Sequence, residues 1–202
     1  KIWGYEALVR GTAGEGAQHV LSQITEQNRY AFDEACRVRA IELAGAALGD
    51  STSKLSINFL PNAVYEPSAC IRATLAAASR MQFDTRRLMF EFTEDERILD
   101  IAHVQHIVAE YRRMGFTTAL DDFGAGYAGL SLLAQFQTDL IKIDMALVRD
   151  IDSSPVKQAI IGGIVALARE VGIVLLAEGV ETEAEVAALK AAGVALFQGY
   201  YF

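Results

Sequence analysis

Short apolar runs alternate with longer, Ala-rich amphipathic stretches along the 202 residues of the chain. Short apolar runs bounded by turn residues are typical of buried strands, whereas the longer stretches have the apolar spacing of helices. This alternation predicts βα repeats around a mostly parallel sheet, which is the α/β class. We expect one domain over residues 1–202, with strands at Ile2–Val9, Lys54–Phe59, Leu88–Phe92, Thr117–Leu120, Leu140–Ile143, Ile173–Ala177 and around Leu196.

Helices are expected between these strands, and several carry their own end signals. Gly115, Gly172 and Gly193 each follow a periodic stretch, where a left-handed glycine ends a helix. The predicted strands are one fewer than the eight of a (β/α)₈ barrel, so we expect part of a longer protein that lacks the first strand and the last helix here. The predicted helices are Thr25–Leu48, Pro67–Met81, Glu94–Met114, Ser154–Val171 and Glu183–Ala192.

Composition restricts the partners and the compartment. The formal net charge is −8 and no run of Lys or Arg interrupts it, so we expect no binding of a nucleic-acid duplex through a basic face. Cys36 and Cys70 form no Cys-x-x-Cys pair, which favours reduced thiols. No apolar run is long enough to span a membrane, and the N-terminus has no signal-peptide pattern. We therefore expect a cytoplasmic protein.

Acidic and amide side chains stand where several predicted strands end. The carboxyl ends of parallel strands meet at one edge, where α/β proteins collect their active-site groups. Crowded carboxylates repel one another, and a divalent cation relieves this repulsion. Ligation by oxygen alone suits Mg²⁺ or Mn²⁺. The residues concerned are Asn58, Glu91, Asp121, Asp122, Asp144 and Glu178, with Glu6 as a further contributor.

Other interpretations of these residues stay open. Each acid can instead cap the next helix or remain solvated in a loop. Lys142, two residues before Asp144 on a predicted strand, forms an internal salt bridge, orients a water molecule, or does both. The stretch from Gly124 to Gly129 also matches G-x-G-x-x-G, a nucleotide fingerprint that would indicate a nicotinamide-dependent oxidoreductase. Four predicted strands precede this motif, whereas dinucleotide folds usually open with it, so we disfavour that interpretation.

Seven motifs stand in order along the chain: Gly4-Tyr5-Glu6-Ala7-Leu8-Val9-Arg10, Asn58 after Leu55-Ser56-Ile57, Glu91-Phe92-Thr93-Glu94, Asp121-Asp122-Phe123-Gly124-Ala125-Gly126-Tyr127, Lys142-Ile143-Asp144, Ala177-Glu178-Gly179-Val180-Glu181 and Gln198-Gly199-Tyr200. Taken together, they resemble the motifs of the EAL domains, bacterial phosphodiesterases that linearise cyclic di-GMP to pGpG. The resemblance covers essentially the whole chain, and the sequences of Ile57–Pro67 and Phe90–Arg97 further resemble the subgroup fused to BLUF blue-light sensors.

This resemblance implies a modified TIM (β/α)₈ barrel with one antiparallel strand and a site for two Mg²⁺ or Mn²⁺ ions. The implied ligands are Glu6, Asn58, Glu91 and Asp121 for one ion, and Asp121, Asp122 and Glu178 for the other.

The resemblance also implies roles in catalysis and substrate binding. Glu178 would act as the general base, and Lys142 would orient the attacking water. Glu94 would anchor the loop that follows Asp122. The implied substrate contacts are Arg10, Asp144, Glu181 and Gln198.

Two functions are compatible with this family: an active phosphodiesterase, or a degenerate module that binds cyclic di-GMP or a protein partner without hydrolysis. Degenerate members typically lose a metal ligand, the base or the anchoring acid, and this chain keeps all of them, which favours the enzyme. Ca²⁺ prefers longer bonds and more ligands than Mg²⁺, so we expect it to inhibit. We also expect a homodimer, and an N-terminal sensory or regulatory domain outside this chain.

Overall fold

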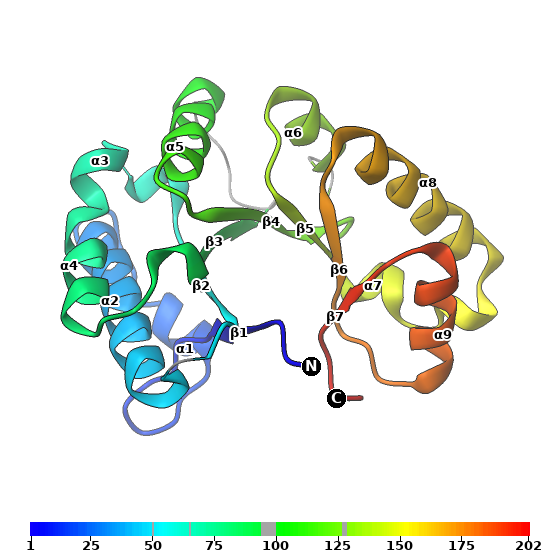
Figure 1. Ribbon diagram of the computed structural model, residues 1–202, viewed down its shortest axis with the longest axis horizontal. Helices are drawn as coiled ribbons and strands as arrows, with labels where there is room; N and C mark the ends of the chain where they lie inside the picture. The colour runs from blue at the N-terminus through cyan, green and yellow to red at the C-terminus, as the bar shows by residue number, and fades with distance from the viewer. Residues whose placement is uncertain (50, 65, 94–99, 127–128) are drawn as a thin grey trace. The chain divides into compact units, whose positions relative to one another are not determined.

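The computed structural model describes residues 1–49, 51–64, 66–93, 100–126 and 129–202. The chain divides into two compact units (Figure 1), one of Lys1–Phe92 with Ile98–Thr117 and one of Thr93–Arg97 with Thr118–Phe202. Strands alternate with helices in both units, so the predicted α/β class is confirmed. Within the described ranges, no helix has the length and apolar character needed to cross a membrane.

The first unit contains three parallel strands in the order β1–β2–β3. The register pairs Glu6 of β1 with Ser56 of β2, and Asn58 of β2 with Glu91 of β3. The elements in chain order are β1 (Gly4–Ala7), α1 (Ala17–Leu21), α2 (Arg29–Leu48), β2 (Lys54–Asn58), the 3₁₀ turn η1 (Pro61–Ala63), α3 (Pro67–Cys70), α4 (Arg72–Arg80), the 3₁₀ turn η2 (Thr85–Arg87), β3 (Leu88–Thr93) and α5 (Ile101–Arg113).

The second unit contains the parallel strand order β4–β5–β6–β7. Its helices are α6 to α9. At least one of them lies between each strand and the next along the chain. The elements are β4 (Thr117–Phe123), α6 (Gly129–Gln135), β5 (Leu140–Ile143), α7 (Met145–Val148), the 3₁₀ turn η3 (Ile151–Ser153), α8 (Pro155–Val171), β6 (Val174–Ala177), α9 (Glu183–Ala192) and β7 (Leu196–Phe197).

All the strands predicted from the sequence form. The family resemblance implied one antiparallel strand, and none of the described strand pairs is antiparallel, so this expectation is wrong for the described residues. Within each unit, every described strand pair is parallel. The connections explain this direction. Helical crossovers return the chain to the edge at which the preceding strand began, so the next strand runs the same way.

The predicted helices also form, with different ends. The stretch expected as one helix over Pro67–Met81 breaks at Ile71 into α3 and α4. Residues 94–99 of the predicted helix Glu94–Met114 lie outside the described residues. The short helices α1, α6 and α7 were not predicted, because helices of four to seven residues are too short to display an apolar periodicity. Positive φ angles at the three predicted glycines confirm the left-handed helix ends.

An aromatic cluster between β3 and α5 forms part of the core of the first unit. Ring centroids of Phe90 and Tyr111 lie 5.0 Å apart, those of Phe90 and Phe116 lie 5.2 Å apart, and those of Phe59 and Phe92 lie 5.6 Å apart. Side chains alternate between the two faces of a strand. Because Phe90 and Phe92 enter this cluster, Glu91 between them points to the opposite face of β3.

The hydroxyl of Tyr111 predicts an unusual response to mutation. Tyr111 is fully buried, its hydroxyl has no hydrogen-bond partner among the described residues, and burial raises its pKa well above the usual range. A buried, unsatisfied polar group costs about 1–3 kcal/mol. Tyr111→Phe keeps the ring and is therefore expected to raise the free energy of unfolding by about 1 kcal/mol, measured by urea titration. Phe90→Leu, a control in the same cluster, should lower it. A loss of stability in Tyr111→Phe would contradict the prediction.

Candidate active site

The first unit brings three of the predicted metal ligands together at the carboxyl ends of its strands. Asn58 Nδ2 donates hydrogen bonds to Glu6 Oε1 and to Glu91 Oε1, both at 3.2 Å. The register places Asn58 directly beside Glu91, whereas Glu6 lies beside Ser56, two residues before Asn58 on the same face of β2. One amide thus joins carboxylates from two other strands.

The buried carboxylate of Glu91 sets the electrostatics of this group. Its second oxygen accepts a hydrogen bond from Ser56 Oγ at 2.6 Å. Ser56 and Asn58 are both neutral donors to this buried carboxylate. Turning the Asn58 amide by a half-rotation would set its oxygen beside the carboxylates of Glu6 and Glu91. The group then offers the oxygen ligands that Mg²⁺ and Mn²⁺ prefer, so these residues fit a hard divalent ion.

A β-bulge in β4 orients the two adjacent aspartates of the second unit. Leu120 of β4 pairs with Ile141 of β5, and Phe123 pairs with Ile143, so β4 carries one extra residue in this interval. In a regular strand Asp121 and Asp122 would point to opposite faces. Asp122 adopts a left-handed backbone with φ of 55°, and the bulge aims both carboxylates to one side.

The resulting acidic cluster comprises Asp121, Asp122 and Glu178. One carboxylate oxygen from each lies within 4.8 Å of those of the others. Glu178 directly follows β6, and its backbone N–H donates to the carbonyl of Ile143 at 3.0 Å, which holds it beside the end of β5. Three carboxylates at this spacing are a second group that fits a divalent ion.

Lys142 forms the internal salt bridge that the sequence predicted. This residue of β5 is 1% exposed, and its Nζ lies 3.0 Å from Asp121 Oδ1 and 2.9 Å from Glu178 Oε1. A buried ammonium requires close anionic partners to offset its desolvation. The side chain therefore ties the ends of β4, β5 and β6 together electrostatically.

Burial dominates the protonation of Glu178. It raises the pKa of this carboxyl to about 8; Lys142 opposes the shift, and the nearby negative charge of Asp121 adds to it. In the metal-free protein this carboxyl therefore exchanges its proton near neutral pH. A group with a pKa near the working pH is suited to general acid–base catalysis.

The loop after β6 is held by Glu185, a residue that the sequence analysis did not single out. Glu185 is buried on α9, and its carboxylate accepts hydrogen bonds from the backbone N–H groups of Glu181 at 2.8 Å, Thr182 at 3.0 Å and Asp150 at 2.9 Å. Burial opposes its ionisation, but these hydrogen bonds outweigh it and lower the pKa of Glu185. Thr182 completes a capping box with Glu185, and the Thr-x-x-Glu spacing was the signal that could have identified it.

Two predicted substrate contacts already have protein partners. The carboxylate of Asp144 caps α7 by accepting a hydrogen bond from the backbone N–H of Ala146 at 2.8 Å. Glu181 forms an ion pair with Arg149 at the surface. The capping interpretation therefore holds for Asp144, and both residues stay predictions as substrate contacts.

The remaining predicted site residues are Arg10, Gln198 and Glu94. Arg10 is exposed, and its guanidinium donates to the carbonyl of Val9 at 2.7 Å. Gln198 is half-buried, and its backbone N–H donates to the carbonyl of Ala177 at 2.8 Å, which sets it beside the end of β6. Glu94 lies outside the described residues.

The glycine-rich segment after β4 has a backbone requirement of its own. Gly124 has a φ of 99°, in the left-handed region that favours glycine. A glycine is therefore favoured there by the backbone, whether or not a nucleotide binds.

Comparisons with known proteins identify the family and show what fraction of each relative's length the chain covers. The family model described as "EAL domain" matches residues 1–202. The blue light- and temperature-regulated antirepressor BluF of Escherichia coli (strain K12) is 31% identical over 203 residues, covering 100% of this chain and 50% of BluF. Cyclic di-GMP phosphodiesterase PA2567 of Pseudomonas aeruginosa is 30% identical over 203 residues, covering 98% of this chain and 34% of PA2567. The chain thus spans half the length of BluF and about a third of PA2567.

Solved structures confirm the fold class. A standalone EAL protein from Vibrio cholerae O395 in its c-di-GMP-bound form is 56% identical, with a TM-score of 0.93 over 99% of this chain and 84% of that chain. The manganese/cy-diGMP complex of Klebsiella pneumoniae BlrP1 is 37% identical, with a TM-score of 0.91 over 100% of this chain and 51% of that chain. These likenesses confirm an α/β fold of the TIM-barrel type, and they leave the dinucleotide interpretation of Gly124–Gly129 without support.

The raised pKa of Glu178 predicts a pH-dependent stability in the metal-free protein. A carboxyl whose pKa rises from 4.5 to about 8 on folding binds its proton more tightly in the folded state. Its stabilising contribution is complete below pH 4.5 and is lost as the pH rises to about 8. Glu178→Gln keeps the shape and cannot titrate. In excess EDTA, the free energy of unfolding of the unmodified chain should therefore fall relative to that of Glu178→Gln as the pH rises through this window.

Urea titrations at fixed pH values measure this difference. Glu183→Gln, at an exposed glutamate on α9, is the matched control and should follow the unmodified chain at every pH. Parallel stability curves for the unmodified chain and Glu178→Gln would show that Glu178 has no raised pKa.

Proposed function

The chain belongs to the EAL domain family, and we propose that it is a metal-dependent phosphodiesterase that hydrolyses cyclic di-GMP to linear pGpG. The observation that carries the proposal is the cluster of Asp121, Asp122 and Glu178, whose carboxylate oxygens lie within 4.8 Å of one another beside the buried ammonium of Lys142. Such a cluster combines metal ligands with a proton acceptor, the two requirements of metal-assisted hydrolysis. The names of relatives such as PA2567, a cyclic di-GMP phosphodiesterase, support the substrate.

The cofactors of this proposal are two Mg²⁺ or Mn²⁺ ions. When bound, such ions lower the pKa of water and offset the negative charge of a phosphodiester, which a chain of net charge −8 would otherwise repel. The manganese complex of BlrP1 with cy-diGMP supports this choice. The proposed ligands are Glu6, Asn58 and Glu91 from the first unit, and Asp121, Asp122 and Glu178 from the second.

Glu178 is the proposed general base, and Lys142 is its partner. A cation held beside Glu178 would lower its pKa from about 8, so that the carboxylate would be ionised and could accept a proton from water at neutral pH. Lys142 Nζ, 2.9 Å from Glu178 Oε1, restrains this carboxylate and can donate a hydrogen bond to the attacking water. Each group thus acts on the same water molecule from a fixed position.

The substrate contacts of the proposal carry over from the family resemblance. Arg10 is exposed, so its guanidinium can donate two parallel hydrogen bonds to a phosphate. Asp144, Glu181 and Gln198 lie at or just after strand ends of the second unit, where polar groups of the substrate would approach. Glu94 is the proposed anchor of the loop after Asp122.

The second candidate function is a binding module without hydrolysis. BluF, which the chain matches over its whole length, is named an antirepressor and not a phosphodiesterase. The two candidates differ in chemistry, because a binding module can dispense with a general base. The intact arrangement of Lys142 and Glu178 favours the enzyme.

The same proposal extends to the whole protein. Because the chain spans half of BluF, we propose that the complete protein carries a sensory or regulatory domain N-terminal to this chain. We further propose that it acts as a homodimer in the cytoplasm.

The proposed metal chemistry predicts a specific response to cations. Hydrolysis of cyclic di-GMP to pGpG should require Mg²⁺ or Mn²⁺ and stop in excess chelator, as measured by chromatography of the nucleotides. Ca²⁺ should inhibit, because its longer bonds and larger ligand number would misplace the reacting water. Full activity in chelator would refute the metal requirement, whereas equal rates with Ca²⁺ would refute the inhibition only.

Substitutions at two carboxylates separate the enzyme from the binding module. Glu178→Ala removes a group needed mainly in the transition state, so kcat should fall by ~10² or more while cyclic di-GMP affinity in Ca²⁺ stays within about tenfold. Lys142→Ala should behave similarly. Glu6→Ala removes a ligand of an ion that also binds the ground-state phosphate, so affinity and rate should both fall.

Calorimetric affinities in Ca²⁺ and initial rates in Mg²⁺ measure the two effects. Hydrolysis by Glu178→Ala at the parent rate would remove Glu178 from the mechanism. Tight binding by the unmodified complete domain, with no pGpG formed with any divalent ion, would establish the binding module.

A further inference from the structure

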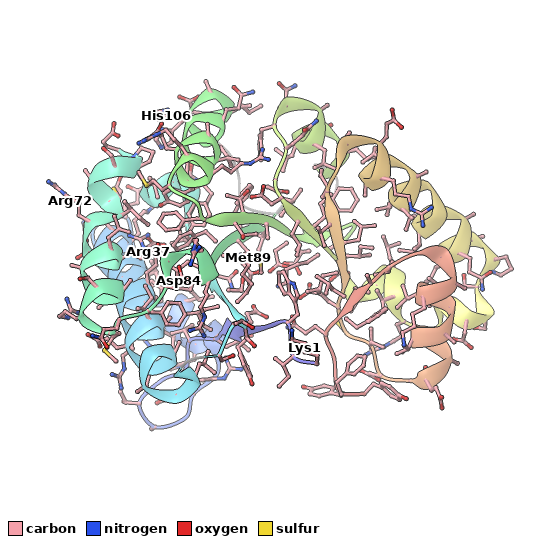
Figure 2. The ribbon with its side chains drawn as sticks, viewed as in Figure 1. Lys1, Arg37, Arg72, Asp84, Met89 and His106 are labelled. Carbon is pink, nitrogen blue, oxygen red and sulfur yellow. The ribbon has the colours of Figure 1, made fainter. Side chains whose placement is uncertain are left out.

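A buried ion pair lies inside the first unit on helix α2, which contacts β2 and α4. Asp33 and Arg37, one helical turn apart on α2, are 4% and 2% exposed and form an ion pair. Figure 2 shows Arg37 within this unit and Arg72 on its surface. Burying two charges costs desolvation energy that their attraction seldom exceeds, so such a pair is weak evidence of added stability. Its hydrogen bonds suggest a different role.

The guanidinium of Arg37 connects three helices. Its Nε donates to Thr74 Oγ1 of α4 at 3.2 Å, and its Nη2 donates to the carbonyl of Cys70, the last residue of α3, at 3.1 Å. Its Nη1 donates to Asp33 Oδ2 on its own helix α2. The position of the Asp33 carboxylate is therefore set by a network that spans α2, α3 and α4.

The other oxygen of Asp33 holds the backbone immediately after β2. Asp33 Oδ1 accepts a hydrogen bond from the backbone N–H of Leu60 at 3.0 Å. The preceding residue, Phe59, donates its N–H to the carbonyl of Glu91 at 3.0 Å and buries its ring in the aromatic cluster. Asn58, the last residue of β2, is thus followed by two residues whose backbone N–H groups are both hydrogen-bonded.

We propose that Asp33 is a positioning residue for Asn58: by holding Leu60, it keeps the end of β2 in the register at which the Asn58 amide meets Glu6 and Glu91. The consequence for metal binding rests on the proposed function, because it takes these three side chains to be ligands. Outer groups that orient a metal ligand typically change affinity by about 10- to 100-fold when they are removed.

The decisive variant replaces the pair by apolar side chains of similar size. Asp33→Leu combined with Arg37→Met keeps the core filled and leaves no unpaired charge, but it offers no acceptor to Leu60. Asn58 is exposed, so NMR of the full chain should report the loss of its two carboxylate partners as a change in the chemical shifts of its side-chain amide protons. Mn²⁺ affinity, measured by electron paramagnetic resonance, should fall by about tenfold or more.

The matched control is Arg80→Gln, which breaks the exposed ion pair between Arg80 of α4 and Glu42 of α2 and should change neither readout. Unchanged Asn58 amide signals in the double variant would overturn the proposal, whatever the metal does. Altered Asn58 signals in a protein that binds no Mn²⁺ even when unmodified would leave the positioning role intact and refute the proposed metal function.

A measurement on the unmodified chain covers the case in which the double variant does not fold. The backbone amide of Leu60 should be protected from hydrogen exchange, and it should lose protection in the same opening event as the backbone amide of Phe59, which donates to the carbonyl of Glu91 at the end of β2, as urea is raised below the unfolding transition. Exchange of Leu60 at the rate of an exposed amide, or in an opening separate from that of Phe59, would overturn the proposal.

Discussion

A lysine buried in a strand needs negative charge beside it, and in the second unit Lys142 obtains that charge from Asp121 and Glu178. The rest of the site depends on this requirement. The β4 bulge brings Asp121 and Asp122 to one side, and the backbone N–H of Glu178 binds the end of β5, so that the carboxylates arrive where the ammonium is fixed. Yet one ammonium cannot neutralise three carboxylates. Burial, together with the negative charge of Asp121, raises the pKa of Glu178, and the cluster is a place where a divalent cation would be stabilised.

The first unit meets a related problem with hydrogen bonds. Glu91 is buried between two aromatic residues in sequence, and strand alternation sends its carboxylate away from the aromatic cluster toward Asn58 and Ser56. Directly after β2, the backbone N–H of Leu60 donates a hydrogen bond to the carboxylate of Asp33. An apolar core on one face and an oxygen-rich end on the other are thus produced by one alternating pattern in β3 and its neighbours.

The sequence predicted every strand and most of the longer helices because its local signals agree with one another. Apolar runs marked every strand, and glycines such as Gly172 and Gly193 marked helix ends, since only glycine adopts their left-handed backbone without strain. Helix α7 was missed because its four residues are too few to show a period. Ser56 was missed as a partner of Glu91, although its position two residues before Asn58 places it on the same face. Asp33 gave no such signal, because its partner Leu60 lies in another element.

The sequence by itself determined the α/β class, the position of each strand and the family, because each of these depends on residue order and local spacing. It also predicted Glu6, Asn58, Glu91, Asp121, Asp122, Lys142 and Glu178 as candidate site residues. Only the tertiary structure decided which of them come together within each unit. The two ion pairs of Lys142 and the hydrogen bond from Leu60 to Asp33 join atoms on different elements. The bulge at Asp122 and the raised pKa of Glu178 likewise depend on neighbouring elements. Such distances and burials are set by packing between segments far apart in the chain, and no local pattern encodes them.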